Sequence, residues 1–243
     1  MQYVVFGANG YIGSYLFQHL KKDGYDVIGT SRKTQMEDDM VYFDIQENNI
    51  DHVLSKVHDE VRIALICIAE PNIDRCFENY DQAYAVNVVQ TKQLVRRLAD
   101  NRFKIIYFST DNVFDGKTGG YTEASQTHPI NKYGMMKAEM EQYMQLYGNA
   151  ACILRIPKVV STDRIKQNIF TEWEERSKTG SVRCIKGNTI SFVCVDDIYR
   201  ACLIVAEKGL NGLYNIVGDR AYSRAELAEV FFDKLGDRQV EIQ

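Results

Sequence analysis

The sequence predicts an α/β fold in which a doubly wound parallel sheet is combined with a small C-terminal α/β lobe. Over the first two-thirds of the 243 residues, short runs rich in β-branched and aromatic residues alternate with longer amphipathic stretches, which is typical of successive βαβ units. After Arg155 this alternation becomes less regular. We therefore divide the chain into residues 1–160, the sheet domain, and residues 161–243, the lobe.

The expected elements follow from these patterns in chain order. Short β-branched runs predict six strands, at residues 2–6, 26–30, 40–44, 61–68, 104–109 and 151–155. Apolar residues at helical spacing predict helices over about 11–23, 82–100 and 132–147. The lobe is expected to hold helices near 165–179, 195–207 and 223–236 and strands near 181–186 and 212–217. A long loop, residues 110–131, precedes the third helix, and loops of this length usually carry function.

Composition excludes several classes of protein. With 45% hydrophobic and 26% charged residues, the chain has the balance of a folded globular protein. Its net charge of -4 argues against a surface that tracks nucleic-acid phosphates. No apolar run reaches the roughly 20 residues of a membrane span, and the N-terminus lacks a signal-peptide pattern, so we expect a cytoplasmic protein without membrane partners. The six cysteines form no C-x-x-C pair, which supports neither a disulfide framework nor a metal site.

Three glycines lie at one spacing between the first strand and the first helix. Glycine permits a tight turn and a close approach of the backbone to a pyrophosphate, and the N-terminus of the next helix attracts anions. The spacing therefore predicts a Rossmann-type dinucleotide site. A tight turn without a ligand is the alternative. The expected cofactor contacts in this turn are Gly7, Asn9, Gly10, Tyr11, Ile12 and Gly13.

The end of the second strand indicates which dinucleotide binds. A carboxylate there would bind the ribose 2′-hydroxyl of NAD, whereas an arginine can bind the 2′-phosphate of NADP. This chain has Ser31 and Arg32 at that place. The residues favour NADP, with NAD as the alternative cofactor, and a solvated surface charge is the other interpretation of Arg32. Asp44, at the end of the third strand, either reaches the adenine or caps the following turn.

Tyr133 and Lys137 are four residues apart on the third predicted helix and so share one face of it. A free tyrosine has a pKa near 10, and a neighbouring ammonium group lowers that value by stabilising the phenolate. The pair therefore predicts a proton donor tuned by a lysine. The spacing alone is weak, because fifteen tyrosines make one such pair common, and a surface pair is the alternative. Its position after the long loop favours catalysis.

Together, the glycine turn, Ser109-Thr110 at a strand end and Tyr133-x-x-x-Lys137 resemble the extended short-chain dehydrogenase/reductase superfamily. More narrowly, the chain is similar to the dTDP-4-dehydrorhamnose reductase branch. The segments that carry this likeness are Ser-Thr-Asp-Asn-Val-Phe-Asp-Gly at 109–116, Tyr-Thr-Glu at 121–123, Pro129-x-Asn131-x-Tyr133-Gly134 and Ala83-Tyr84-Ala85-Val86-Asn87. The resemblance covers residues 1 to about 160.

The resemblance implies a role for each matching residue. Tyr133 protonates a carbonyl oxygen while hydride arrives from the nicotinamide, Thr110 hydrogen-bonds the same oxygen, and Lys137 tunes Tyr133 and holds the nicotinamide ribose. The further expected cofactor contacts are Ile45, Ile68, Ala69, Asn87, Ser109 and Ile156. The expected substrate contacts are Asp111, Val113, Lys158 and Arg183, with Arg164, Lys166 and Lys186 as other cations of the lobe that are suited to a diphosphate. Solvated surface charge is the alternative for each cation.

Three positions depart from the pattern of relatives. Sugar dehydratases of the superfamily carry an Asp-Glu pair where this chain has Asp111-Asn112, which disfavours dehydration. The rhamnose-pathway reductases have an aromatic residue where this chain reads Arg155-Ile156-Pro157-Lys158. Glu70 replaces a small neutral residue beside the expected pyrophosphate, so it either points away or serves the substrate.

The sequence therefore predicts an NADPH-dependent reductase of a keto group, at C4, on a nucleotide-activated deoxysugar. The expected substrate is a nucleoside-diphosphate sugar, and we expect a homodimer. One alternative is an epimerase of the same superfamily, which keeps its cofactor bound. The other is a non-catalytic dinucleotide-binding subunit, because the regulatory subunit of methionine adenosyltransferase resembles this branch. The presence of Thr110, Tyr133 and Lys137 together argues against the second.

Overall fold

The computed structural model describes residues 1–33, 39–47, 49–161, 169–178, 181–182, 184, 189–236 and 241–242. The chain forms two compact units. The first unit is Met1–Arg155 with Tyr199–Asn215, and the second is Ile156–Ile198 with Ile216–Gln243. This division differs from the predicted boundary at 160/161. It differs because the chain returns to the first unit at Tyr199 and adds a strand to its sheet.

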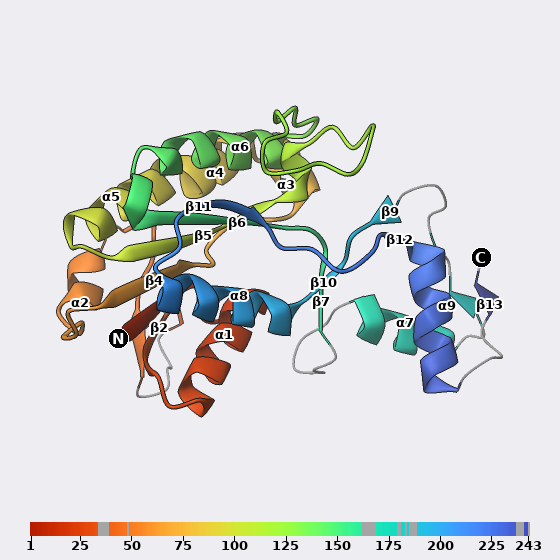
Figure 1. Cartoon of the computed structure of the whole chain (residues 1–243), viewed down its shortest axis with the longest axis horizontal. Helices are drawn as coiled ribbons and strands as arrows, with labels where there is room; N and C mark the ends of the chain where they lie inside the picture. Colours follow the sequence, from red (N-terminus) through yellow and green to blue (C-terminus); the bar gives the residue numbers. More distant parts are fainter. Residues whose placement is uncertain are drawn as a thin grey trace. The chain divides into compact units, whose positions relative to one another are not determined.

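A seven-stranded sheet forms the centre of the first unit (Figure 1). Its strands are β1 (Gln2–Phe6), β2 (Asp26–Ser31), β3 (Met40–Tyr42), β4 (Arg62–Ile66), β5 (Lys104–Thr110), β6 (Ala151–Ile156) and β11 (Gly212–Asn215). They lie in the order β11-β6-β5-β4-β1-β2-β3, and β1 pairs in parallel with both β2 and β4. The predicted doubly wound parallel sheet is confirmed. The strand order reverses between β1 and β4, and ligands of such sheets bind at the carboxyl ends of the strands there.

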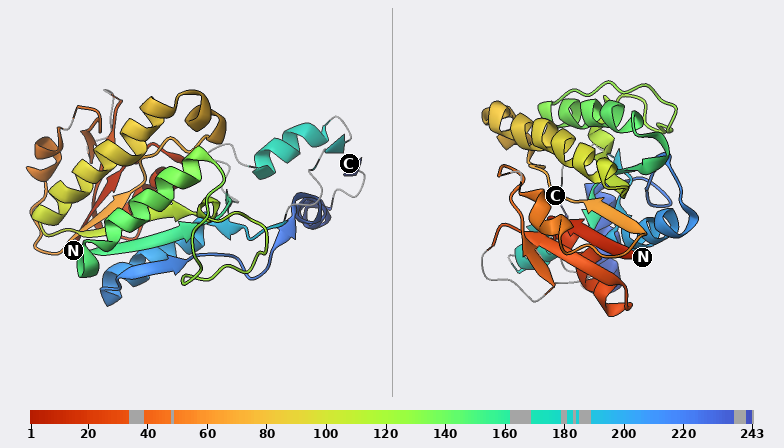
Figure 2. Two further views of the ribbon diagram at one scale, coloured as in Figure 1. Left: turned by 90° about the horizontal axis from the view of Figure 1, so that it is seen from above. Right: turned by 90° about the vertical axis from the view of Figure 1, so that its left-hand side faces the viewer.

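Helices cover both faces of this sheet (Figures 1 and 2). One face carries α1 (Tyr11–Lys22) and the part of α8 (Val195–Lys208) from Tyr199 onward. The Tyr199 hydroxyl joins these two helices by donating to Asp23 at 2.7 Å. The opposite face carries α4 (Tyr80–Tyr84), α5 (Thr91–Asp100) and α6 (Lys132–Gln145). The short helices α2 (Ile50–Leu54) and α3 (Ile73–Glu78) were not predicted, because one turn or two show no apolar period.

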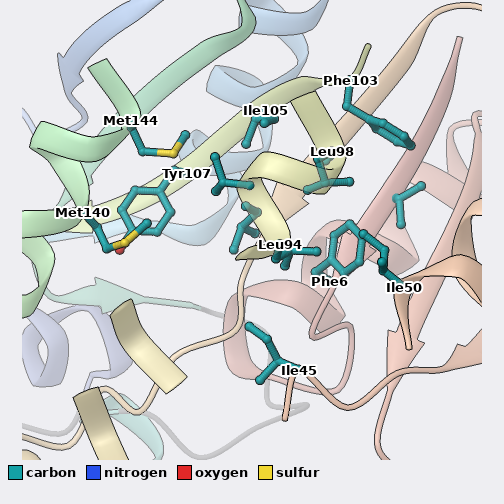
Figure 3. Packing of buried hydrophobic residues seen from close by; sticks show 14 of the residues in the cluster. Phe6, Ile45, Ile50, Leu94, Leu98, Phe103, Ile105, Tyr107, Met140 and Met144 are labelled. Carbon is teal, nitrogen blue, oxygen red and sulfur yellow. The ribbon is translucent and has the colours of Figure 1, made fainter. Parts of the chain in front are cut away.

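The main hydrophobic core lies between the sheet and helices α5 and α6 (Figure 3). Leu94 and Leu98 of α5 are buried against Phe6 and Ile105 of the sheet. Removal of such side chains from water supplies about 25 cal/mol per Å² of apolar surface. Burial of these apolar stripes therefore holds α5 and α6 against the sheet at the edge where β4 and β5 end.

The helix predicted over 82–100 consists of α4, a π-helical segment η1 (Ala85–Gln90) and α5. The Thr91 hydroxyl donates to the Val86 carbonyl at 2.7 Å, which satisfies a backbone acceptor in the widened turn. π-helical turns are rare and often lie at functional sites. Asn87, one of the expected cofactor contacts, lies within this segment.

The second unit has its own small core, formed by Ile169, Trp173, Val182, Phe192, Ala228 and Phe232. Its helices are α7 (Ile169–Ser177) and α9 (Arg224–Leu235), and α9 begins at a capping box between Ser223 and Glu226. Its short strands are β7 (Val159–Val160), β8 (Ser181–Val182), β9 (Thr189–Ile190), β10 (Val193–Cys194), β12 (Tyr222–Ser223) and β13 (Glu241–Ile242). The predicted strand over 181–186 is observed only as β8, and residues 183, 185 and 186 lie outside the described residues.

No helix in the described ranges has the length and apolar character needed to cross a membrane. In the same ranges, no three His, Cys, Asp or Glu side chains are grouped so that they could hold a metal ion.

Candidate functional site

The glycine turn lies between β1 and α1, as predicted, and its backbone is tightly packed. The Gly10 amide donates to the Gly7 carbonyl at 2.9 Å, and Gly7 has a φ of 87°. A Cβ atom at Gly13 would lie 2.2 Å from the Gly7 carbonyl oxygen, so only glycine lets α1 approach the turn this closely. Helix α1 has no side-chain cap at Gly10 and no acidic residue in its first turn. Its N-terminus is therefore suited to the pyrophosphate of a dinucleotide.

A cavity of about 810 Å³ opens beside this turn, within the first unit. It reaches from the ends of β1 and β2 to the segment after β4, where the strand order of the sheet reverses. Nine of the expected cofactor contacts line it: Gly7, Asn9, Gly10, Ser31, Arg32, Asp44, Ile45, Ile68 and Ala69. These residues fit a dinucleotide, because a glycine turn at a helix N-terminus and an arginine at the end of β2 border one cavity.

The end of β2 presents positive charge to the cavity. Arg32 is exposed and lines the cavity. Lys33 also lines it, although it was not among the expected cofactor contacts. Ser31 is buried, and its hydroxyl accepts from the Lys33 amide at 3.0 Å and from the Asn9 side chain. Ser31 therefore fixes the path of the chain around the glycine turn and directs the next two side chains to the cavity.

Asp44 caps the turn that follows β3, which is one of the two roles expected for it. Its carboxylate accepts from the Gln46 amide at 2.9 Å, so it caps the turn that follows β3. Its backbone amide donates to Asn49 at 3.3 Å. The residue also lines the cavity, where Ile45 supplies an apolar wall.

Asn87 is buried and binds the backbone of Glu70 on both sides of its amide group. Its Oδ1 accepts from the Glu70 amide at 2.8 Å, and its Nδ2 donates to the Glu70 carbonyl at 3.0 Å. Asn87 thus holds the wall segment after β4. The Glu70 carboxylate forms an ion pair with Arg75 at 3.5 Å, and both residues line the cavity. Arg75 was not expected at the site because it lies on α3, a helix too short to show an apolar period in the sequence.

Thr110 ends β5 and begins a turn of 3-10 helix, η2 (Asp111–Val113). Its hydroxyl accepts from the Asn112 side chain at 3.1 Å and donates to Asp111 at 3.1 Å. The Asn131 side chain, which caps α6, also donates to Asn112 at 2.9 Å. The cap therefore ties the helix of Tyr133 to the turn that carries Thr110.

Lys137 is buried on α6 and points toward the end of β5. Its Nζ donates to the Phe108 carbonyl at 2.7 Å and lies 4.5 Å from the centre of the Tyr107 ring. Burial lowers the pKa of Lys137 to about 8. The distance from Nζ to the centre of the Tyr133 ring is 5.8 Å.

The predicted lowering of the Tyr133 pKa is not observed in this structure. Burial raises the pKa of Tyr133 above its usual value, and the nearby Cys76 and Asp111 add to that shift. The prediction differs because the Lys137 ammonium is directed to a backbone carbonyl rather than to the phenol. Tyr133 consequently holds its proton over the physiological range, as a proton donor must.

Other expected site residues have packing or structural contacts here. Val113 is fully buried with Phe114 and Ala138 in a small core, so its side chain does not face a substrate. Ser109 is also buried, and its hydroxyl donates to Glu141. Ile156 is buried at the end of β6.

Of the expected lobe cations, Lys158 is exposed in the second unit, and its carbonyl accepts from the Val193 amide at 3.2 Å. Arg164, Lys166, Arg183 and Lys186 lie outside the described residues.

Comparison with known proteins places the chain in a family and finds similar reductases. The RmlD substrate binding domain model matches residues 1–243. The chain is 24% identical to the probable low-salt glycan biosynthesis reductase Agl14 of Haloferax volcanii over 238 residues, which are 96% of this chain and 79% of that protein. It is 27% identical to the dTDP-4-dehydrorhamnose reductase of Mycobacterium tuberculosis over 239 residues, 96% of this chain and 75% of that protein.

Two further similarities bear on the alternatives. The chain is 26% identical to the methionine adenosyltransferase 2 subunit beta of Danio rerio over 210 residues, 85% of this chain and 64% of that protein. The crystal structure of dTDP-4-dehydrorhamnose reductase from Bacillus anthracis in complex with NADP superposes with a TM-score of 0.86, at 23% identity, and covers 100% of this chain and 83% of that one. The fold is therefore shared with that enzyme. Because the family model spans the whole chain, this protein belongs to the RmlD substrate-binding domain family, within the extended short-chain dehydrogenase/reductase superfamily.

Proposed function

We propose that the chain is an NADP-dependent reductase of a keto group, at C4, on a nucleotide-linked deoxysugar. One observation carries the proposal: α6, the helix of Tyr133 and Lys137, is tied by its cap to the Thr110 turn, at the edge of the sheet that also borders the dinucleotide cavity. The similarity to a glycan biosynthesis reductase and to a dTDP-4-dehydrorhamnose reductase supports the same chemistry.

NADP in its reduced form, when bound, supplies the hydride that adds to the carbonyl carbon. The Tyr133 hydroxyl gives its proton to the carbonyl oxygen, so that the ketone becomes an alcohol. The Thr110 hydroxyl turns its proton from Asp111 to the same oxygen and donates a hydrogen bond there as negative charge develops. Lys137 remains protonated below about pH 8. Its positive charge stabilises the phenolate that Tyr133 becomes once it has given up its proton.

The cofactor preference follows from the residues at the end of β2. Arg32 and Lys33 border the cavity, and no carboxylate ends this strand to bind the 2′-hydroxyl of NAD. NADP is therefore the preferred cofactor. The substrate's diphosphate is assigned to cations of the second unit, Lys158 and Arg183 among them, and the protein acts as a homodimer in the cytoplasm.

The experiment follows the absorbance of NADPH in the presence of dTDP-, UDP-, GDP- and CDP-linked 4-ketosugars, with NADH in a parallel series. We expect NADPH to be consumed with one of these sugars and NADH to be consumed more slowly. Tyr133→Phe should reduce turnover by about 10² to 10⁴, the range for general acid catalysis, and leave NADPH binding intact. Tyr143→Phe is the matched control, because it removes a hydroxyl from the same helix that bonds only Tyr147 and the Lys92 carbonyl among described residues.

Retention of the normal rate by Tyr133→Phe would overturn the assignment of the proton donor. Interconversion of two nucleotide sugars without net consumption of NADPH would identify the epimerase instead. Tight dinucleotide binding without turnover of any sugar would favour a binding subunit, the alternative to which the similarity with methionine adenosyltransferase 2 subunit beta points.

A further inference from the structure

The face of α6 that carries Tyr133 and Lys137 continues one turn further to a buried carboxylate. Residues 133, 137 and 141 are spaced by four, so Glu141 follows the pair on the same side of the helix. Its side chain is 3% exposed. A carboxylate is almost never buried to this degree without charged and hydrogen-bonding partners.

Glu141 has three such contacts, and they come from two strands. The Arg155 guanidinium of β6 donates through Nε to Oε1 at 2.9 Å and through Nη2 to Oε2 at 2.7 Å. The Ser109 hydroxyl of β5 donates to Oε1. The contacts therefore join α6 to β5 at the residue directly before Thr110, and to the neighbouring strand β6.

Arg155 extends the connection to the long loop after β5. Its guanidinium carbon lies 4.8 Å from the centre of the Phe114 ring, and that ring is stacked on Tyr121 at 4.3 Å. The Tyr121 hydroxyl donates to Asp115 within the same loop. One buried ion pair thus contacts the helix of Tyr133, the strand of Thr110 and the loop that follows Thr110.

Stability alone does not account for this pair. Replacement of a buried ion pair by apolar side chains of similar volume is often neutral or stabilising, because the desolvation of two charges offsets their attraction. The remaining guanidinium nitrogen, Nη1, is buried and has no hydrogen-bond acceptor in the described part of the chain, which adds to the unfavourable terms. The fixed geometry of the contacts is the property that an apolar pair would lose.

We propose that Glu141 and Arg155 are a positioning pair, which sets the register of α6 against β5 and so fixes the spacing between the Thr110 and Tyr133 hydroxyl groups. This inference rests on the proposed function. An α-helix rises about 1.5 Å per residue, so a slip of α6 by even one residue along its axis would carry Tyr133 out of reach of the carbonyl oxygen that Thr110 holds. A misplacement of about 1 Å can reduce a reaction rate about 100-fold.

The test compares the variant Glu141→Gln with the double variant Glu141→Leu/Arg155→Met, in which both buried charges are replaced by apolar side chains. The double variant should melt at or above the temperature of the wild type, because it leaves no unpaired charge. We expect both variants to lose about 10- to 100-fold in kcat, with KM for NADPH changed less than about twofold, since the cavity residues are untouched. Glu139→Gln is the control. Glu139 lies on the same helix but is partly exposed and forms an ion pair with Lys92, so the kcat of this variant should equal that of the wild type.

A stable double variant with the kcat of the wild type would overturn the proposal, because the pair would then serve stability only. If the wild type turns over no ketosugar, the proposed function fails. The role of Glu141 and Arg155 in positioning α6 is then tested by amide hydrogen exchange. Glu141→Gln should then speed exchange at residues 109–113 and 132–137 by at least about tenfold, with β1 unchanged. Unchanged exchange in these two segments would overturn the positioning pair independently of activity.

Discussion

Lys137 is an ammonium group held in a buried position, and this sets how the stability of the fold depends on pH. Burial lowers its pKa from 10.5 to about 8. Between these two values the unfolded chain keeps the proton that the folded chain has released, so the free energy of unfolding rises with pH in that window. Below about pH 8 both states are charged, and the folded state carries the full cost of desolvation.

We therefore predict that the difference in the free energy of unfolding between wild type and Lys137→Met becomes more favourable to the wild type from pH 7 to pH 9.5. A single group contributes at most about 1.4 kcal/mol per pH unit, so the total change should be about 1 to 2 kcal/mol. Urea denaturation at intervals of half a pH unit measures this difference, and other titrating groups cancel between the two proteins. A difference that stays constant would show that the pKa of Lys137 is the same in the folded and unfolded states, and one that falls with pH would show that folding raises it; either result would contradict the prediction.

At the level of single residues, some of the expected site residues line the cavity and others are buried in the core. The glycine turn and the residues at the ends of β2 and β3 line one cavity, because parallel strands bring their carboxyl ends to one edge of the sheet. Ser109 and Val113 are buried instead, because Ser109 donates to Glu141 and Val113 packs with Phe114 and Ala138. The partner of Ser109, Glu141, could not be assigned, because periodicity alone does not identify which buried carboxylate faces which strand.

At the level of elements, the N-terminus of α6 depends on a close approach of two backbones. A Cβ atom at Gly134 would lie 2.1 Å from the carbonyl oxygen of Asn112, which is backbone and cannot move aside as a flexible side chain would. The Gly134 amide donates a hydrogen bond to Oδ1 of the capping residue Asn131 at 2.8 Å. Gly134 therefore allows the helix that bears Tyr133 to rest on the turn that follows Thr110.

We predict that Gly134→Ala pushes α6 away from η2, lowers the free energy of unfolding by about 1 to 3 kcal/mol and reduces kcat more than it weakens NADPH binding. Denaturant titration and steady-state kinetics measure the two effects. Met135→Ala is the control, because Met135 is the next residue of the same helix and is exposed. A Gly134→Ala enzyme with unchanged kcat would mean that the contact with Asn112 does not position Tyr133.

The long helices and strands predicted from the sequence are present in the structure, but the π-helical segment within one of the helices was not predicted. Short, nearly continuous apolar runs identify these strands well because a buried parallel strand needs apolar side chains on both faces. The π-helical segment η1 within the helix predicted over 82–100 changes the hydrogen-bond pattern without interrupting the apolar stripe, so no sequence pattern reveals it. Asn87 acquires its two bonds to Glu70 within this segment.

For the whole molecule, the sequence predicted two parts but not how the chain divides between them. The segment Tyr199–Asn215 returns to the first unit, where β11 pairs with β6 in parallel. A strand pattern indicates that a strand exists, but its partner depends on contacts between residues far apart in the chain. The second unit nevertheless has a hydrophobic core of its own, as a separate lobe requires.

This division gives a test of the ligands assigned to each unit. The described residues that line the cavity all belong to the first unit. NADPH should therefore slow amide hydrogen exchange at residues 7–13, 30–33, 44–46 and 67–70 and leave α9 of the second unit unchanged. A nucleoside diphosphate that binds the cations of the second unit should slow exchange around residues 156–161 instead, and Lys158→Ala should abolish that effect. Protection of 156–161 by NADPH alone would assign Lys158 to the cofactor. Protection of the glycine turn by the nucleoside diphosphate alone would show that it occupies the dinucleotide cavity, and the proposed role of the second unit in binding the substrate would then be wrong.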